Sequence, residues 1–223
     1  MKISDLQLIN DVANDPTSIF ELINIKRFDL IKSLIDDKIV SINIVDDGGN
    51  NLIIRLLKVK EYDLVSYLLN NKSLDINKSN LNGNSFLHVL VKDSNVKAIK
   101  ILDSVINRSD IIVDSINNSG YTPLDIAINN NYLVIAFKTL FSNKFGNITI
   151  GSLIRLINTF LSPRYGVYSR ISNFNTFIDG IKNINLSLEV SLFIDYLIDN
   201  VDNINLAIKT DNKKMFDGII KMA

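Results

Sequence analysis

Residues 114–127, which read Asp-Ser-Ile-Asn-Asn-Ser-Gly-Tyr-Thr-Pro-Leu-Asp-Ile-Ala, decide the fold. They join a polar turn around Gly120 to the start of a short helix. The Thr122 hydroxyl can cap free backbone N–H groups, and Pro123 suits the first helical turn because it has no N–H to leave unbonded. A polar break follows at residues 129–131. We expect a second helix after this break.

The same element recurs along the chain. A shift of 37 residues carries Gly83 onto Gly120, and a shift of 34 carries Gly49 onto Gly83. The shift of 34 also places the apolar pattern of residues 28–35 on that of residues 62–69. Each unit therefore predicts a Gly turn followed by two short helices. Helices of fewer than ~12–15 residues are marginal alone in water, so we expect the units to stack on one another.

This recurring element resembles the ankyrin repeat, whose units of about 33 residues carry a Thr-Pro-Leu-His tetrapeptide. The family's units also contain a Gly before this tetrapeptide and an Ala in the first helix. Residues 80–88 are similar, with Ser85 for Thr and Phe86 for Pro, whereas residues 46–54 keep only the Gly and a Leu-like position. The resemblance implies an all-α fold, an ankyrin-type solenoid of stacked helix-turn-helix repeats with irregular helical repeats at the C-terminal end.

We expect one elongated domain over residues 1–223. It would hold a degenerate N-terminal repeat at 17–42, three clearer repeats at 43–141, and divergent helical repeats or a cap at 142–223. Residues 19–36 read as a helix pair. In the last part, apolar spacing predicts helices over 148–161 (closed by Pro163 and Gly166), 172–181 and 188–198, and a degenerate pair within 205–220.

Composition argues against several functional classes. Lys and Arg together number 24, as do Asp and Glu, so no net charge draws the chain onto nucleic acid or anionic lipid. With no Cys and one His, we expect no metal site, no cofactor and no cysteine catalysis. The polar N-terminus lacks a signal peptide, and no apolar run approaches the ~18 residues that span a bilayer. We expect an intracellular, cytoplasmic protein without a membrane partner.

Several residues allow a catalytic or ligand-binding reading beside a structural one. His88 could be a general base, but the resemblance implies that it is the His of the tetrapeptide and bonds to the adjacent turn. Asp36-Asp37 and Asp46-Asp47 could bind a cation, but solvated turns explain them better. Gly48-Gly49 lacks the Lys-Ser/Thr of a phosphate loop.

Basic and aromatic residues leave two further alternatives. The first set could touch phosphate along one face of the stack, although solvated helix faces explain it better; it comprises Lys58, Lys60, Lys97, Lys100 and Lys209–Lys214. The second set lies in a stretch after Pro163 that reads as a loop, and it could be an interface anchor or a loop folded onto the core. It comprises Arg164, Tyr165, Tyr168, Arg170 and Phe174.

Stacked helix pairs offer a curved groove and a row of turn tips, and we therefore expect a non-catalytic protein–protein interaction module. Its partner would be a protein, and the chain a monomer or a subunit of a hetero-complex. By resemblance, the tip positions are Asp46, Asp47, Leu81, Asn82, Asn117, Asn118 and Tyr121. The groove positions on the first helices are Arg55, Lys58, Val89, Lys92, Ile126 and Asn129.

Two functions remain open for such a module. The Ile- and Asn-rich composition is typical of A/T-rich genomes, including those of large DNA viruses and intracellular microbes, and such a protein could be an adaptor acting on proteins in the host cytoplasm. Alternatively, it is a structural or assembly component of a larger particle. An unrecognised hydrolase is disfavoured by the missing Cys and the single His.

Overall fold

The computed structural model describes residues 3–141, 149–162, 165–182 and 187–222. In these ranges every regular element is helical, and the only β pairing is an isolated bridge between Val45 and Asn51. The prediction of an all-α fold is therefore confirmed. The chain divides into two compact units: unit 1 comprises residues 1–111 and 115–121, and unit 2 comprises residues 112–114 and 122–223.

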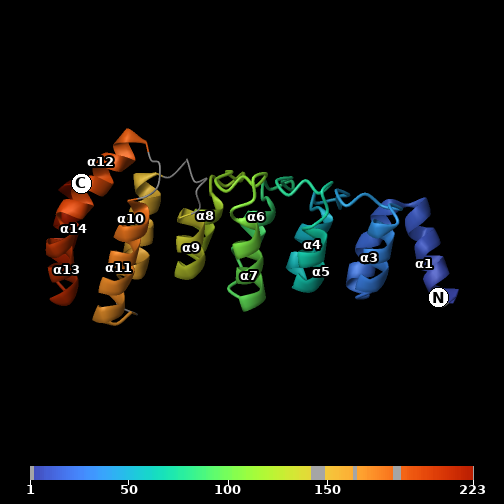
Figure 1. Ribbon diagram of the computed structural model, residues 1–223, viewed down its shortest axis with the longest axis horizontal. Coiled ribbons are helices and arrows are strands. Elements are labelled where there is room, and N and C mark those ends of the chain that lie inside the picture. The colour runs from blue at the N-terminus through green and yellow to red at the C-terminus, as the bar shows by residue number, and fades with distance from the viewer. Residues whose placement is uncertain (1–2, 142–148, 163–164, 183–186, 223) are drawn as a thin grey trace. The chain divides into compact units, whose positions relative to one another are not determined.

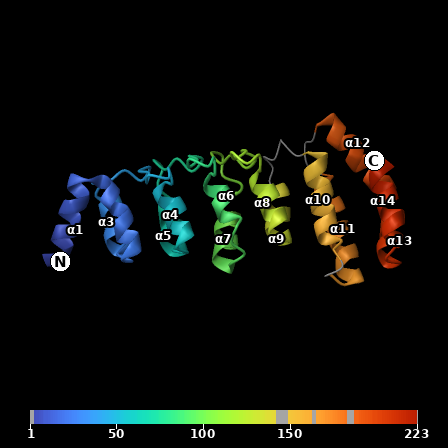
Figure 2. The same ribbon diagram turned by 180° about the vertical axis from the view of Figure 1, so that it is seen from behind.

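Unit 1 is a series of helix pairs joined by extended turns. Its elements are α1 (Ile3–Asn14), the 3₁₀ turn η1 (Pro16–Ser18), α2 (Ile19–Asn24), α3 (Phe28–Asp36), α4 (Leu52–Lys58), α5 (Tyr62–Leu68), α6 (Phe86–Leu90) and α7 (Val96–Val105). First helices contact first helices in α2, α4 and α6, and the second helices α5 and α7 contact each other. The turns of this unit lie along one edge of its row of helices (Figures 1 and 2).

The first helices α4 and α6 are short. A polar cap residue begins each of them, and the second helix of the pair follows within a few residues. The Asn51 side chain accepts from the Ile54 N–H at the start of α4, and Ser85 forms a capping box with His88 at the start of α6. Every Leu, Ile and Phe side chain of both helices is buried. Each fully buried Leu, Ile or Phe contributes about 1.5–3 kcal/mol, so stacking supplies the stability that these helices lack alone.

Unit 2 is also helical within its described residues. Its elements are α8 (Pro123–Asn129), α9 (Leu133–Leu140), α10 (Ile150–Phe160), α11 (Val167–Ile181), α12 (Leu188–Asp199), α13 (Val201–Lys209) and α14 (Lys213–Met222). Thr122 caps α8 and Pro123 occupies its first turn, as the sequence predicts. The pair α8 and α9 and the pair α13 and α14 pack most closely.

The expected helices of the N- and C-terminal parts are largely confirmed, with two corrections. Helix α1 was not predicted. The predicted loop after Pro163 is helical from Val167 onward, because α11 begins there and includes Tyr168, Arg170 and Phe174. Pro163, Arg164 and Ile148 lie outside the described residues.

Among the described helices, none is both long enough and apolar enough to cross a bilayer.

Candidate functional site

Three turns of unit 1 are built in the same way. Asp46, Asn80 and Asn117 occupy the same repeat position, and each directs Oδ1 at two backbone N–H groups of its own turn. In the last turn, Asn117 Oδ1 accepts from the N–H groups of Ser119 and Tyr121, each at 3.0 Å. Asp46 accepts likewise from Gly48 and Asn50. Each turn is therefore closed by a side chain as well as by backbone bonds.

Neighbouring turns are also joined to each other. The Leu81 N–H donates to Gly48 O, and the Asn118 N–H donates to Asn82 O, both at 3.1 Å. Two side-chain amide bonds run in parallel with these backbone bonds. They link Asn80 Nδ2 to Asn50 Oδ1 at 2.8 Å and Asn117 Nδ2 to Asn84 Oδ1 at 2.9 Å. The turns form a ladder that fixes the side chains at their tips.

Several residues at the tips of the ladder are exposed, four of them among the predicted tip positions apart from Asn82. Asp47, Leu81 and Asn118 occupy one repeat position in successive turns, and Tyr121 lies three residues after Asn118. Leu81 is 70% exposed and Tyr121 43% exposed. We call Asp47, Leu81, Asn118 and Tyr121 the tip row. Of the other predicted tip residues, Asp46 and Asn117 hold their turns, while Asn82 is exposed and contributes its carbonyl to the ladder.

The predicted groove positions of unit 1 lie on the first helices α4 and α6, except for Lys92, which follows α6 by two residues. Arg55 and Val89 are partly exposed and correspond to each other in α4 and α6, and Lys58 and Lys92 are both exposed and correspond likewise. We call Arg55, Lys58, Val89 and Lys92 the first-helix face. Arg55 Nε lies 3.5 Å from Asp46 Oδ2, and Lys58 Nζ donates to Asn50 Oδ1 at 2.8 Å. In unit 2, Ile126 is buried and Asn129 is exposed.

Electrostatics distinguish Lys58 from an ordinary surface lysine. Partial burial lowers the pKa of Lys58 below its usual value, and the positive charges of Arg55 and Lys92 lower it further, while Asp46 opposes them. The first-helix face thus gathers like charges.

His88 is a structural residue that joins two repeats. It is fully buried, and Nδ1 accepts from the Ser85 N–H at 3.2 Å and contacts the Ser85 hydroxyl at 2.8 Å. Nε2 lies 3.0 Å from Tyr121 O. A carbonyl can only accept, so the proton is on Nε2 and the ring is neutral. This geometry agrees with the structural role that the resemblance implies.

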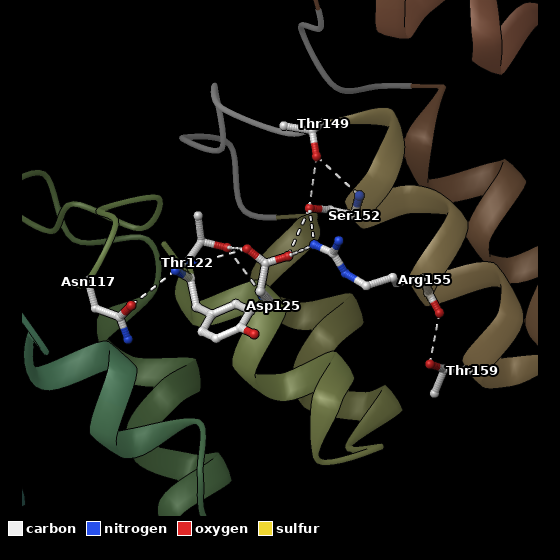
Figure 3. A network of polar contacts seen from close by, with 8 residues as sticks. Asn117, Thr122, Asp125, Thr149, Ser152, Arg155 and Thr159 are labelled. Atoms are coloured by element: carbon white, nitrogen blue, oxygen red, sulfur yellow. Dashed lines mark hydrogen bonds and ion pairs between the residues drawn. The ribbon is translucent and has the colours of Figure 1, made fainter. Parts of the chain in front are cut away.

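Asp125 takes the place of His88 in the next repeat. Its carboxylate accepts from the N–H and hydroxyl of Thr122, from Ser152 Oγ at 2.8 Å and from Arg155 Nη2 (Figure 3). Burial raises the pKa of Asp125, but these hydrogen bonds outweigh burial and hold it below its usual value. The carboxylate therefore stays charged and ties α8 to α10.

Other predicted sites do not come together. Lys97 and Lys100 lie on α7 beside a groove of about 760 Å³ that α5 also lines, and Lys97 pairs with Asp63 at 2.9 Å. Lys58 and Lys92 do not line this groove. Phe174 is buried, Tyr168 is 90% exposed, and Arg170 pairs with Asp211 at 2.9 Å. These residues form no common surface.

The sequence reasoning missed the amide ladder. Its signal is the recurrence of Asp46, Asn80 and Asn117, and of Asn50 and Asn84, at the repeat interval. In an Asn-rich chain this recurrence is easily attributed to composition.

Among the described residues, no group of three or more His, Asp or Glu is placed to hold a metal ion.

Comparison with known families agrees with the stacked pairs and the capped turns. Residues 57–149 match the family described as ankyrin repeats (3 copies). These residues are thus similar to ankyrin repeats, which in general are non-enzymatic modules that mediate protein–protein interaction. No curated protein matches the sequence.

Proposed function

We propose that the protein is a non-catalytic adaptor that binds a partner protein through the tip row and the first-helix face of unit 1. The observation that carries this proposal is the exposure of Leu81, an apolar side chain, at the end of a turn that hydrogen bonds hold on both sides. Leu81 N bonds to Gly48 O, and Leu81 O accepts from Asn118 Nδ2 at 2.9 Å. A large apolar side chain on a fixed backbone loses little conformational entropy on binding.

The neighbouring residues suit the same purpose. Tyr121 offers an aromatic ring at the next turn, and aromatic residues are enriched among the residues that dominate interface energy. The polar members of the tip row, Asp47 and Asn118, lie in the turns on either side of the Leu81 turn. A small apolar centre with a polar rim is the usual organisation of a protein–protein interface.

A triple variant tests this proposal. Asp47→Ala, Leu81→Ala and Tyr121→Ala remove exposed side chains without touching the amides that close the turns. Asn117 must be kept, because its amide holds a turn and its loss would confound binding with stability. A matched control carries Asp37→Ala, Val96→Ala and Lys100→Ala, which are exposed on or beside the second helices.

The measurement is quantitative mass spectrometry of proteins captured by each variant from extracts of the native cells. We expect the tip variant to lose the proteins that the wild-type chain and the control variant both retain, with all three showing the same unfolding midpoint. If the tip variant captured the same proteins as the wild-type chain, the binding surface would lie elsewhere on the protein.

A further inference from the structure

We propose that the partner presents a short acidic segment, and that Lys58 and Lys92 bind its carboxylates. This inference rests on the proposed function, since it names the chemistry of the partner at the same surface. The first-helix face would bind the acidic segment of the partner. The tip row would contact an apolar residue beside that segment.

The two lysines occupy the same position in successive repeats. Lys58 ends α4, and Lys92 follows α6 by two residues. Both are exposed, and Lys58 Nζ is held toward the turns by its bond to Asn50 Oδ1. Because the repeats stack, a single extended segment crossing α4 and α6 would meet Lys58 at the end of α4 and Lys92 just after α6.

The acids near these lysines do not balance them. Arg55, Lys58 and Lys92 contribute three positive charges to the first-helix face, and the turns contribute two negative charges, at Asp46, whose Oδ2 lies 3.5 Å from Arg55 Nε, and at Asp47. The residue that corresponds to Asp46 in the next repeat is the neutral Asn80. Asp93, beside Lys92 in the sequence, accepts a short hydrogen bond from the Tyr62 hydroxyl.

Lys92 has free capacity to bind an anion. Among the residues that the structure describes, no acidic side chain pairs with it within 4.0 Å, whereas Arg27, Lys97 and Arg108 of the same unit each pair with an aspartate. Its charge acts on Lys58 and on His88. A partner carboxylate would relieve this repulsion.

The helix dipole does not by itself explain the lysines. Cations near a helix C-terminus are favoured by typically 0.3–1 kcal/mol, and this reasoning applies to every helix of the unit. The second helices α3, α5 and α7 nevertheless have no basic residue in their last turns, whereas α4 has Arg55 and Lys58. Among the helices of unit 1, α4 alone has Lys or Arg in its last turn, directly after the turn that holds Asp47.

An acidic protein segment fits this surface better than nucleic acid does. Proteins that bind nucleic acid typically neutralise about 6–10 phosphates, far more than two or three cations can reach. Leu81 and Tyr121 add an apolar contact that a phosphate backbone would not use.

The test is a selection of short random peptides displayed on phage, with the immobilised full-length protein as bait. We expect selected peptides to be enriched in Asp and Glu and to contain an apolar residue. Synthesised and labelled, they should bind in fluorescence anisotropy with an affinity that falls as salt rises. The double variant Lys58→Gln/Lys92→Gln should weaken them about tenfold, whereas Lys97→Gln/Lys100→Gln on α7 should not.

The outcomes separate this inference from the proposed function. Peptides without excess acid that nevertheless lose binding on Leu81→Ala would overturn the acidic segment and leave the interaction surface standing. Acidic peptides that bind Lys58→Gln/Lys92→Gln as tightly as the wild type would also overturn it. So would a labelled single-stranded DNA that binds more tightly than any peptide, or a selection that yields no binding peptide.

Discussion

Asp125 on α8 and Arg155 on α10 form an ion pair at 2.5 Å, although they are 30 residues apart in the sequence. Asp125 is buried, whereas half of the Arg155 side chain is exposed. At the corresponding position in the preceding repeat, His88 reaches the carbonyl of Tyr121. One helix position therefore joins successive repeats by two different chemistries, a neutral imidazole and a charged carboxylate.

Replacing Asp125 with Ala should destabilise unit 2. The change leaves the Thr122 N–H and the Ser152 hydroxyl without their acceptor and removes the ion pair with Arg155. It should therefore lower the free energy of unfolding by about 2–4 kcal/mol. Urea unfolding followed by circular dichroism measures this change. The control is Asp179→Asn on α11. Because Asp179 is exposed, this substitution should change the free energy of unfolding by less than about 0.5 kcal/mol. A loss no larger than that of the control would show that the network does not hold α8 to α10.

The pH dependence of unfolding should report His88, the chain's one histidine. Burial lowers the pKa of His88 below its ordinary value of 6.5, with the charge of Lys92 acting in the same direction. The unfolded chain therefore binds a proton at a higher pH than the folded chain, so stability falls as pH drops from about 7 to 5.5. The midpoints of urea unfolding, measured at several pH values in this range, give the slope of stability against pH.

His88→Gln is the matched variant for this experiment. Gln can keep the capping box with Ser85 but cannot titrate, so the variant should be less stable by about 1–3 kcal/mol and should lose the slope between about pH 7 and 5.5. An unchanged slope in His88→Gln would mean that other groups cause it.

Two glycines of the turns should respond differently to alanine. Gly83 and Gly120 both have positive φ, at 73° and 78°, so Ala is strained at each by about 1–2 kcal/mol. A Cβ on Gly83 would in addition lie 2.7 Å from the backbone nitrogen of Asn118, whereas a Cβ on Gly120 would meet nothing within 4 Å. Gly83→Ala should therefore lower the unfolding midpoint more than Gly120→Ala. Equal losses would contradict the close approach of adjacent turns.

Much of the fold could be predicted because each repeat carries its own local signals. The Gly turn, Thr122 and Pro123 act within a few residues, and the interval between copies shows that the units stack. Helix α1 and the start of α11 were missed because no motif precedes them. The long-range partner of Asp125 was also missed, since nothing near Asp125 in the sequence points to Arg155.

The candidate site was only partly predictable. Resemblance gave the repeat positions of the predicted site, but not which of these residues are exposed. Asp46 and Asn117 turn inward to close their turns, and Ile126 is buried although Val89, its counterpart, is partly exposed. These differences arise from packing between repeats, which the spacing of residues along one repeat does not contain.

Site-specific photocrosslinking tests the central claim most directly, namely that the fixed turns present the partner-binding surface. A photoreactive phenylalanine analogue would replace Leu81 in one chain and Lys100, on α7, in another. After irradiation in native cells, we expect covalent protein adducts from position 81 and none from position 100. Adducts from position 100 with none from position 81 would contradict the account.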